Sequence, residues 1–299
     1  YQKLPQYIKE LRIYLKKNQY SIVHSHLNTL SVFPLFAAWT CHIPVRIAHN
    51  HSVPSGKEVA RDSLKYILRV FSRVFSTDYF ACSEKAGRWL FGNKNYDTNK
   101  VTIMKNATDF ERFKINIDDV KKAKEQLGLN GKFVVGCIGR FTFAKNHEFL
   151  LKVFKKILEV RSDSRLLLVG DGELNQQIHD SVKNKDLEKE VIFVGKVTNP
   201  ELYYHMVNVV AVPSVFEGLS LTTIESQLSG IPVVAPTAVP SEAIISDGVV
   251  RLNLEESDWV NTILLMENKQ VVLDERSMDY EIHSAVKKLE DWIEEKVNE

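Results

Sequence analysis

The sequence predicts an α/β protein built from two doubly wound, Rossmann-like domains. Short β-rich runs alternate with helical periods along the chain, which is typical of parallel sheets covered by helices. The 299 residues are 44% hydrophobic, enough to bury a sizeable core in each domain. A charged segment that ends in glycine and asparagine, near residues 118–131, separates two series of strands. We therefore expect domains at residues 1–118 and 119–299.

The first domain opens with an amphipathic helix that starts at Leu4. Its strands are expected at residues 21–25, 45–49, 79–83 and 101–105. Residues 59–75 predict an amphipathic helix with one apolar face and, on the other, a basic stripe of Arg61, Lys65, Arg69 and Arg73. Anionic lipid headgroups would attract such a stripe by about 1 kcal/mol per cation. A solvated face on a helix packed into the core explains the pattern equally well.

The second domain repeats this alternation. Its strands are expected at residues 133–139, 165–169, 191–195, 207–212 and 231–235. Its helices are expected at 146–160, from 173 onward, and at 221–230. The last helix, 281–297, has apolar residues at helical spacing, so that one of its faces suits packing on a core.

The composition excludes several classes of protein. With 39 basic and 38 acidic residues the net charge is +1, which gives no global signature of nucleic-acid binding. The three scattered cysteines have no metal-ligand spacing and fit a reducing cytoplasm. The longest apolar run, near residues 32–39, is too short to span a bilayer, and no signal peptide is visible.

Two carboxylates near the centre of the second domain are the most informative feature. Glu217 and Glu225 lie eight residues apart, across a turn that opens a helix. Backbone N–H groups at a helix start favour a diphosphate, and carboxylates accept hydrogen bonds from sugar hydroxyls. Both glutamates could instead simply solvate the helix start. The segment resembles the paired-glutamate motif of retaining glycosyltransferases of the GT-B fold, glycosyltransferase family 4 (glycosyl transferases group 1), of the bacterial exopolysaccharide or capsule type.

The resemblance implies a GT-B architecture, in which two Rossmann-like domains face a cleft. The family's first strands and its glycine-bearing loop have no counterpart before Tyr1, so we expect an N-terminal domain that is truncated. The resemblance also implies that helix 281–297 crosses back to the first domain. The residues that it implies for donor binding are Arg140, Lys145, Val197, Glu217, Gly218, Leu219, Ser220, Leu221 and Glu225.

Roles follow for several of these residues. Arg140 and Lys145 follow a strand and resemble the family's Gly-Arg…Lys-Asn motif, whose cations bind the donor phosphates and stabilise the leaving diphosphate. By the same resemblance Glu225 binds the ribose and Glu217 the transferred sugar, while Glu242 is a candidate on the acceptor side. With two cations present and no Asp-x-Asp pair, we predict no metal.

Two His-x-His pairs end strands of the first domain, at His24 and His26 and at His49 and His51. Such pairs suggest a metal site, but no nearby cysteine or carboxylate completes a ligand set. The second pair resembles the family's catalytic histidine; His49 and His51 both remain candidates, and loop position favours His51. For the first pair we expect a structural role. Ser83, Asn106 and Asp109 are expected to cap turns or helices.

The sequence thus predicts a glycosyltransferase, and the resemblance implies that it retains the anomeric configuration of the sugar. We expect it to transfer a hexose-type sugar from a nucleotide sugar, UDP-linked by family habit, to a growing and lipid-linked surface polysaccharide or oligosaccharide. We expect it in the cytoplasm, peripheral on the inner face of the plasma membrane, with contact through residues 59–75 and with no cofactor and no nucleic acid. Two alternatives remain: a sugar-nucleotide epimerase of the same fold, and a catalytically inactive nucleotide-binding scaffold.

Overall fold

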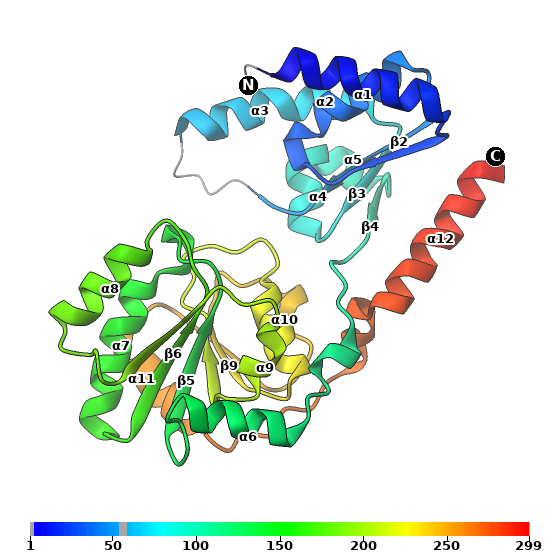
Figure 1. Ribbon diagram of the computed structural model, residues 1–299. Coiled ribbons are helices and arrows are strands. Elements are labelled where there is room, and N and C mark those ends of the chain that lie inside the picture. Colours follow the sequence, from blue (N-terminus) through cyan, green and yellow to red (C-terminus); the bar gives the residue numbers. More distant parts are fainter. Residues whose placement is uncertain (1–2, 54–58, 299) are drawn as a thin grey trace. The chain divides into compact units, whose positions relative to one another are not determined.

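The computed structural model describes residues 3–53 and 59–298, which divide into two compact units (Figure 1). The first unit contains residues 1–107 together with 282–299, and the second contains Thr108–Glu281. The expected division at residue 118 therefore lies about ten residues beyond the structural one. The segment between them joins the second unit because Phe113 is buried in that unit's core.

The first unit is a parallel four-stranded sheet in the order β1-β2-β3-β4, with helices packed on it. Its strands are β1 (Ile22–Ser25), β2 (Val45–Asn50), β3 (Asp78–Ala81) and β4 (Val101–Ile103). Its N-terminal helices are α1 (Leu4–Asn18), η1 (Asn28–Ser31), α2 (Val32–Thr40), α3 (Val59–Phe75), α4 (Glu84–Phe91) and α5 (Asn93–Asp97). Ser83 accepts a hydrogen bond from the amide of Ala86 and so caps α4, as expected.

Helix α3 differs from a core-packed amphipathic helix. Its apolar side chains Leu64, Ile67, Val70, Phe71 and Val74 are 38–63% exposed. The helix is held instead by small and aromatic residues: the buried hydroxyl of Ser72 donates to the carbonyl of Thr29, and Phe75 contacts Phe36 and Trp39. Arg61, in the predicted basic stripe, lies outside the residues whose side chains the structure describes.

The last helix, α12 (Ile282–Asn298), belongs to the first unit although it follows the second in the sequence. Leu289 and Trp292 pack against Ile47, Phe80 and Met104, and the Trp292 ring meets the Phe80 ring edge-on with centroids 4.9 Å apart. Of the apolar positions predicted from helical spacing, Leu289 thus packs on the sheet of the first unit together with Trp292, which the prediction did not include, whereas the predicted Val286 is 43% exposed. Within residues 3–53 and 59–298, no helix combines the length and apolar character needed to cross a bilayer.

The second unit is a six-stranded parallel sheet in the order β10-β9-β8-β5-β6-β7. Its strands are β5 (Phe133–Ile138), β6 (Ser164–Val169), β7 (Val191–Gly195), β8 (Val209–Ala211), β9 (Val233–Pro236) and β10 (Val249–Leu252). Its helices and helical turns are η2 (Phe110–Phe113), α6 (Ile117–Gln126), η3 (Phe143–Lys145), α7 (His147–Val160), α8 (Asn175–Asn184), α9 (Pro200–Tyr204), α10 (Leu221–Leu228), η4 (Ser241–Ala243), α11 (Glu256–Leu265) and η5 (Glu275–Tyr280). Cores on both faces of this sheet bury the apolar side chains of β5, β6 and β8.

The strand order reverses between β5 and β8, the first and fourth strands of this unit, which pair with each other. Such a switch point parts the loops at the carboxyl ends of its two strands, and ligands of open α/β sheets bind there. The doubly wound prediction is therefore confirmed. The two loops at the switch point, 139–146 after β5 and 212–220 after β8, hold Arg140, Lys145 and Glu217.

Candidate nucleotide-sugar site

The two switch-point loops are tied to each other by backbone contacts. The amide of Val215 donates to the carbonyl of Ala144 at 2.9 Å. The hydroxyl of Thr222, in the first turn of α10, donates to the carbonyl of Ile138 at the end of β5 at 3.1 Å. The start of α10 is therefore fixed beside the end of β5, and side chains that are far apart in sequence meet.

Lys145 and Glu217 form an ion pair at this junction. Nζ of Lys145 lies 2.7 Å from Oε1 of Glu217, and the same oxygen accepts a 2.7 Å hydrogen bond from the hydroxyl of Ser214. The two charged side chains are only 21% and 11% exposed. Two predicted donor-binding residues are thus in direct contact. A diphosphate entering this site would compete with Glu217 for Lys145.

Glu225 lies in the middle of α10 and bonds to a residue that the sequence had not suggested. Its Oε2 accepts a 2.8 Å hydrogen bond from the hydroxyl of Tyr204, which is fully buried at the end of α9. Burial raises the pKa of the Glu225 carboxyl, and the Tyr204 bond opposes that change. Burial and the Glu225 charge also raise the pKa of Tyr204. Tyr204 therefore remains protonated at neutral pH and orients the carboxylate.

A pocket of about 360 Å³ lies at the carboxyl ends of β5, β6 and β7. Its lining includes Arg140, Asp171, Lys196 and Val197 together with backbone at glycines. The loops approach so closely that a Cβ at Gly170 would lie 1.9 Å from the carbonyl oxygen of Gly139. Asp171, in the Gly-Asp-Gly turn, accepts hydrogen bonds from the Gly172 amide and from the Asn175 side chain, so it stabilises the turn.

The residues that open α10 divide by what they can offer a ligand. Leu219 is buried in the core, so only its backbone can contribute, whereas Leu221 is 43% exposed. Ser220 has a left-handed backbone (φ 64°), and its hydroxyl bonds to that of Thr223. Gly218 precedes this turn in the same loop. The amides of Thr223 and Ile224 donate to the Ser220 carbonyl, so the amides of Leu221 and Thr222 are those that precede the helical hydrogen bonds at the switch point.

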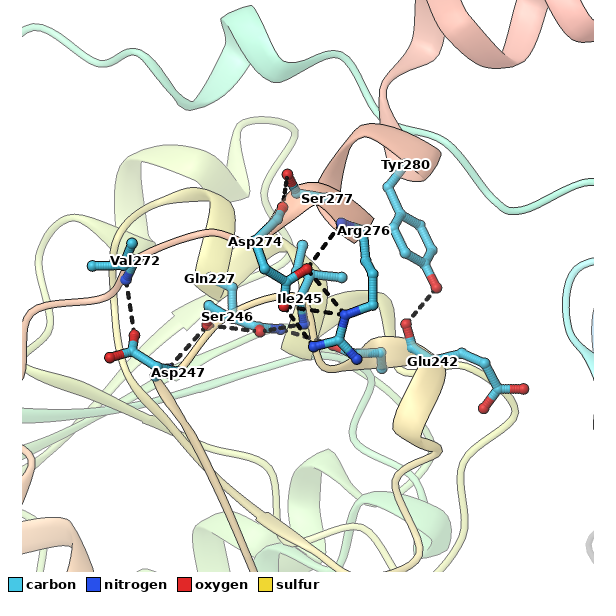
Figure 2. Close-up of polar contacts among 12 residues, drawn as sticks. Gln227, Glu242, Ile245, Ser246, Asp247, Val272, Asp274, Arg276, Ser277 and Tyr280 are labelled. Atoms are coloured by element: carbon cyan, nitrogen blue, oxygen red, sulfur yellow. Dashed lines mark hydrogen bonds and ion pairs between the residues drawn. The ribbon is translucent and has the colours of Figure 1, made fainter.

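Gln227 anchors α10 to the following loop, as Figure 2 shows. Its amide nitrogen donates to the carbonyls of Thr223 and Ala243, and its oxygen accepts from the amide of Ile245 and the hydroxyl of Ser246, all at 2.8–2.9 Å. All four bonds are buried, so this side chain fixes the loop after β9 to the helix that carries Glu225.

Glu242 lies on the same loop, where its backbone carbonyl accepts a 2.5 Å hydrogen bond from the hydroxyl of Tyr280. Figure 2 shows its carboxylate pointing away from this network. The loop position of Glu242 is therefore fixed through its backbone, and its carboxylate is left for another role. No contact among the described residues assigns that role, and its place on the acceptor side stays a prediction.

Four histidines of the first unit, those of the two His-x-His pairs, meet at the ends of β1 and β2. His24 contacts His49, and His26 contacts His51, through ring nitrogens 3.1 and 2.9 Å apart. Nδ1 of His51 lies 2.7 Å from the side-chain oxygen of Asn106. The expected capping role of Asn106 is therefore wrong: it bonds to the candidate catalytic histidine instead. Asp109 does cap its helical turn, through the amide of Glu111.

Sequence reasoning missed Tyr204, Ser214, Gln227 and the His51 contact of Asn106. Of these, only Gln227 left a signal, a polar side chain next to the apolar stripe of a predicted helix. The remaining three act through partners set by the fold.

Comparison with known proteins identifies the same region. A family model described as "Glycosyl transferases group 1" matches residues 119–281. The chain is 31% identical over 265 residues to "Putative glycosyltransferase EpsF" of Bacillus subtilis (strain 168), covering 86% of this chain and 69% of that protein. It is 26% identical over 273 residues to an Escherichia coli protein described as "UDP-Gal:alpha-D-GlcNAc-diphosphoundecaprenol alpha-1,3-galactosyltransferase", again covering 86% of this chain and 69% of that one.

Solved structures share the fold. The structure described as "Anabaena Alr3699/HepE in complex with UDP-glucose" superposes with a TM-score of 0.80 at 19% identity, over 96% of this chain and 82% of that one. A sucrose-phosphate synthase from Thermosynechococcus elongatus superposes with a TM-score of 0.79 at 18% identity, over 100% of this chain and 79% of that one. At these identities the likeness establishes the architecture, two Rossmann-like units.

Proposed function

The chain belongs to the glycosyl transferases group 1 family and is a glycosyltransferase of the GT-B fold, and from this premise we propose that it transfers a hexose-type sugar from a UDP-sugar donor to a lipid-linked surface polysaccharide precursor, with retention of configuration. The observation that carries the proposal is the Lys145–Glu217 pair at the switch point of the second sheet. A cation and a carboxylate, both largely desolvated, are what a phosphate–sugar linkage requires.

Each charged group at the site has a role in this proposal. Lys145 exchanges Glu217 for the diphosphate, and Arg140, exposed beside the pocket, stabilises the charge that develops as UDP leaves. Released from Lys145, Glu217 accepts hydrogen bonds from the sugar hydroxyls. Glu225, held by Tyr204, accepts those from the ribose. These two cations supply the positive charge that a metal provides in other transferases, so the proposed transfer step needs none.

The pocket beside Arg140 is proposed to bind the uracil base. Its volume of about 360 Å³ is within the usual range for small-molecule sites, about 300–1,000 Å³. Val197 lines this pocket and also packs against the core of the second unit, so that its backbone is held firmly enough to contact a base. The choice of UDP rests on relatives: the E. coli protein is named for UDP-Gal, and the Anabaena protein was solved with UDP-glucose.

The first unit is proposed to supply the catalytic histidine. His51 is favoured over His49, because His49 is 3% exposed whereas His51 is less buried and is fixed by Asn106. A neutral imidazole can accept a proton or stabilise a developing positive charge. Burial lowers the pKa of His51, which keeps the ring neutral at physiological pH.

The acceptor is proposed to be reached at a membrane surface through α3. The five exposed apolar side chains of this helix would enter the boundary of a bilayer. The cations contribute less than the sequence suggests, because Arg69 packs on the Tyr66 and Trp89 rings and Arg73 donates to the carbonyl of Phe91. The E. coli relative is named for a diphosphoundecaprenol acceptor, which supports a lipid-linked substrate. The proposed location is therefore the cytoplasmic face of the plasma membrane.

A transfer assay tests the proposal and separates it from its rivals. The chain would be incubated with UDP-glucose, UDP-galactose or UDP-N-acetylglucosamine, each with and without undecaprenyl-diphosphate-linked sugar in vesicles. We expect product only with acceptor present, and an α-linkage by NMR from these α-linked donors. Epimerised donor without acceptor would favour the epimerase. UDP binding with no transfer to any acceptor would favour the scaffold.

A further inference from the structure

The four histidines at the ends of β1 and β2 form one tight cluster, for which the proposed transfer reaction accounts only in part. In a strand, side chains two residues apart share a face, so each His-x-His pair points to the same side of the sheet. Parallel pairing of β1 with β2, with His24 opposite Ile47, then places the two pairs side by side. The ring centroids of neighbouring histidines lie only 4.0–5.2 Å apart.

Hydrogen bonding fixes the tautomer of His26. The side-chain carbonyl oxygen of Asn106 can only accept, so Nδ1 of His51 carries the proton between them. Nε2 of His51 must then accept, and Nδ1 of His26 donates to it. The lone pair of His26 is left on Nε2, and His26 is an exposed residue. Metal-bound histidines typically show this pattern, in which the second ring nitrogen donates to a fixed partner.

His49 presents a second unused nitrogen. Its Nδ1 bonds to Nε2 of His24, whereas its Nε2 is buried and makes no hydrogen bond to any described residue.

We propose that His24, His26 and His49 form a site for one divalent transition-metal ion, of which Zn²⁺ is the best match. One ring nitrogen from each lies within 4.8 Å of the other two. Tetrahedral zinc, with Zn–N distances of about 2.0–2.1 Å, needs nitrogens about 3.3 Å apart, so the rings need to close by roughly an ångström. Imidazole ligands suit zinc, copper and nickel, not the hard cations Mg²⁺ and Ca²⁺.

The hydrogen bonds also set the order in which the three rings can bind the ion. The 3.1 Å bond between His24 and His49 uses the lone pair of one of these two rings, so only the other ring has a lone pair for the ion. The ring whose lone pair is used can become the third ligand only after this bond breaks. The ion would join the ends of β1 and β2, with His51 and Asn106 as outer partners of His26. The ion would therefore lie one hydrogen bond from His51, the proposed catalytic histidine, but its binding can be tested whether or not the proposed transfer reaction is correct.

Direct binding tests the site without any assay of activity. Untagged, EDTA-treated protein would be titrated with ZnCl₂ by calorimetry and with CoCl₂ by its visible d–d absorption. We expect one ion per chain, a Kd in the micromolar range or tighter, a tetrahedral cobalt spectrum and no response to MgCl₂. At 100 times Kd, zinc should raise Tm by roughly 5–10 °C.

Variants decide which residues bind the ion. His26→Ala, at an exposed position, should fold normally and weaken zinc binding at least tenfold, with a smaller loss for His24→Ala. His283→Ala removes an exposed histidine from α12 and is the matched control, expected to leave Kd unchanged. Zinc affinity unaffected by His26→Ala, or reduced equally by His283→Ala, would overturn the proposal, as would an octahedral cobalt spectrum.

Discussion

Tyr204→Phe isolates the contribution of one hydroxyl to nucleotide binding. This hydroxyl donates the 2.8 Å hydrogen bond that orients Glu225, and the ring around it is fully buried. Bonds to charged groups contribute about 1.5–3 kcal/mol, so the variant should lose stability of that order. In the variant a ligand must itself immobilise the Glu225 side chain, at a cost of about 0.5–1.5 kcal/mol. UDP affinity should therefore fall about 2- to 12-fold.

The assay compares two ligands on two variants by titration calorimetry. If Glu225 binds the ribose hydroxyls, Tyr204→Phe should weaken UDP and leave the already weak binding of 2′,3′-dideoxy-UDP unchanged. Tyr203→Phe removes the neighbouring, partly buried hydroxyl and should change neither affinity. An equal loss for both ligands on Tyr204→Phe would refute the reasoning, because the hydroxyl would then act on the fold as a whole and not through the ribose.

Three further predictions follow from the second unit. Lys145→Gln should lower UDP affinity, measured by calorimetry, about 10- to 100-fold. Glu217→Gln frees the lysine, so it should bind UDP at least as tightly but lose about 100-fold or more in the rate of transfer. If both variants lost UDP affinity in parallel, the assignment of Lys145 to the diphosphate and Glu217 to the sugar would be refuted. Burial, aided by the Lys145 charge, lowers the pKa of His147 from 6.5 to about 4, so the folded state resists its protonation. The contribution of His147 to stability is complete above pH 6.5 and should fall by about 3 kcal/mol as pH drops to 4. Other buried histidines also lose stability in this range, so denaturant titrations should find a loss about 3 kcal/mol smaller in His147→Phe than in the unchanged chain, and an equal loss would contradict the assignment. Gly170→Ala would place a Cβ 1.9 Å from a backbone oxygen and should lower the free energy of unfolding by more than about 4 kcal/mol. Gly131→Ala is the control, because φ is also positive there but no atom lies within 4 Å, and it should cost only about 1–2 kcal/mol. Similar Tm values for the two variants would contradict the close approach at Gly170.

Much of the fold was predictable because it follows from local periodicity. The strand over 133–139 and the helix over 146–160 lie within two residues of β5 and α7, since continuous apolar runs and 3.6-residue spacing are properties of the segment itself. The meeting of Lys145 and Glu217 was predictable for a related reason. Each follows a strand, and the carboxyl ends of parallel strands meet at one edge of a sheet.

Partners set by packing were not predictable. Tyr204 bonds to Glu225 across 21 residues and Asn106 to His51 across 55, and neither separation has a local signature. Helix α3 illustrates a second limit. Its periodicity predicts an apolar face, but only the fold shows that this face is exposed while Ser72 packs inward. The sequence pattern fixes which residues share a face and leaves open what covers that face.

Binding of UDP, with GDP as the comparison, tests the proposed donor site most directly. At 100 times Kd a ligand stabilises its protein by about 2.7 kcal/mol, which is roughly 5–10 °C in Tm for domains of this size. We predict such a shift with UDP, none with GDP at the same concentration, and a much smaller UDP shift for Lys145→Gln. A chain shown to be folded whose Tm is unmoved by UDP, or moved equally in Lys145→Gln, would contradict a UDP-sugar site at the switch point.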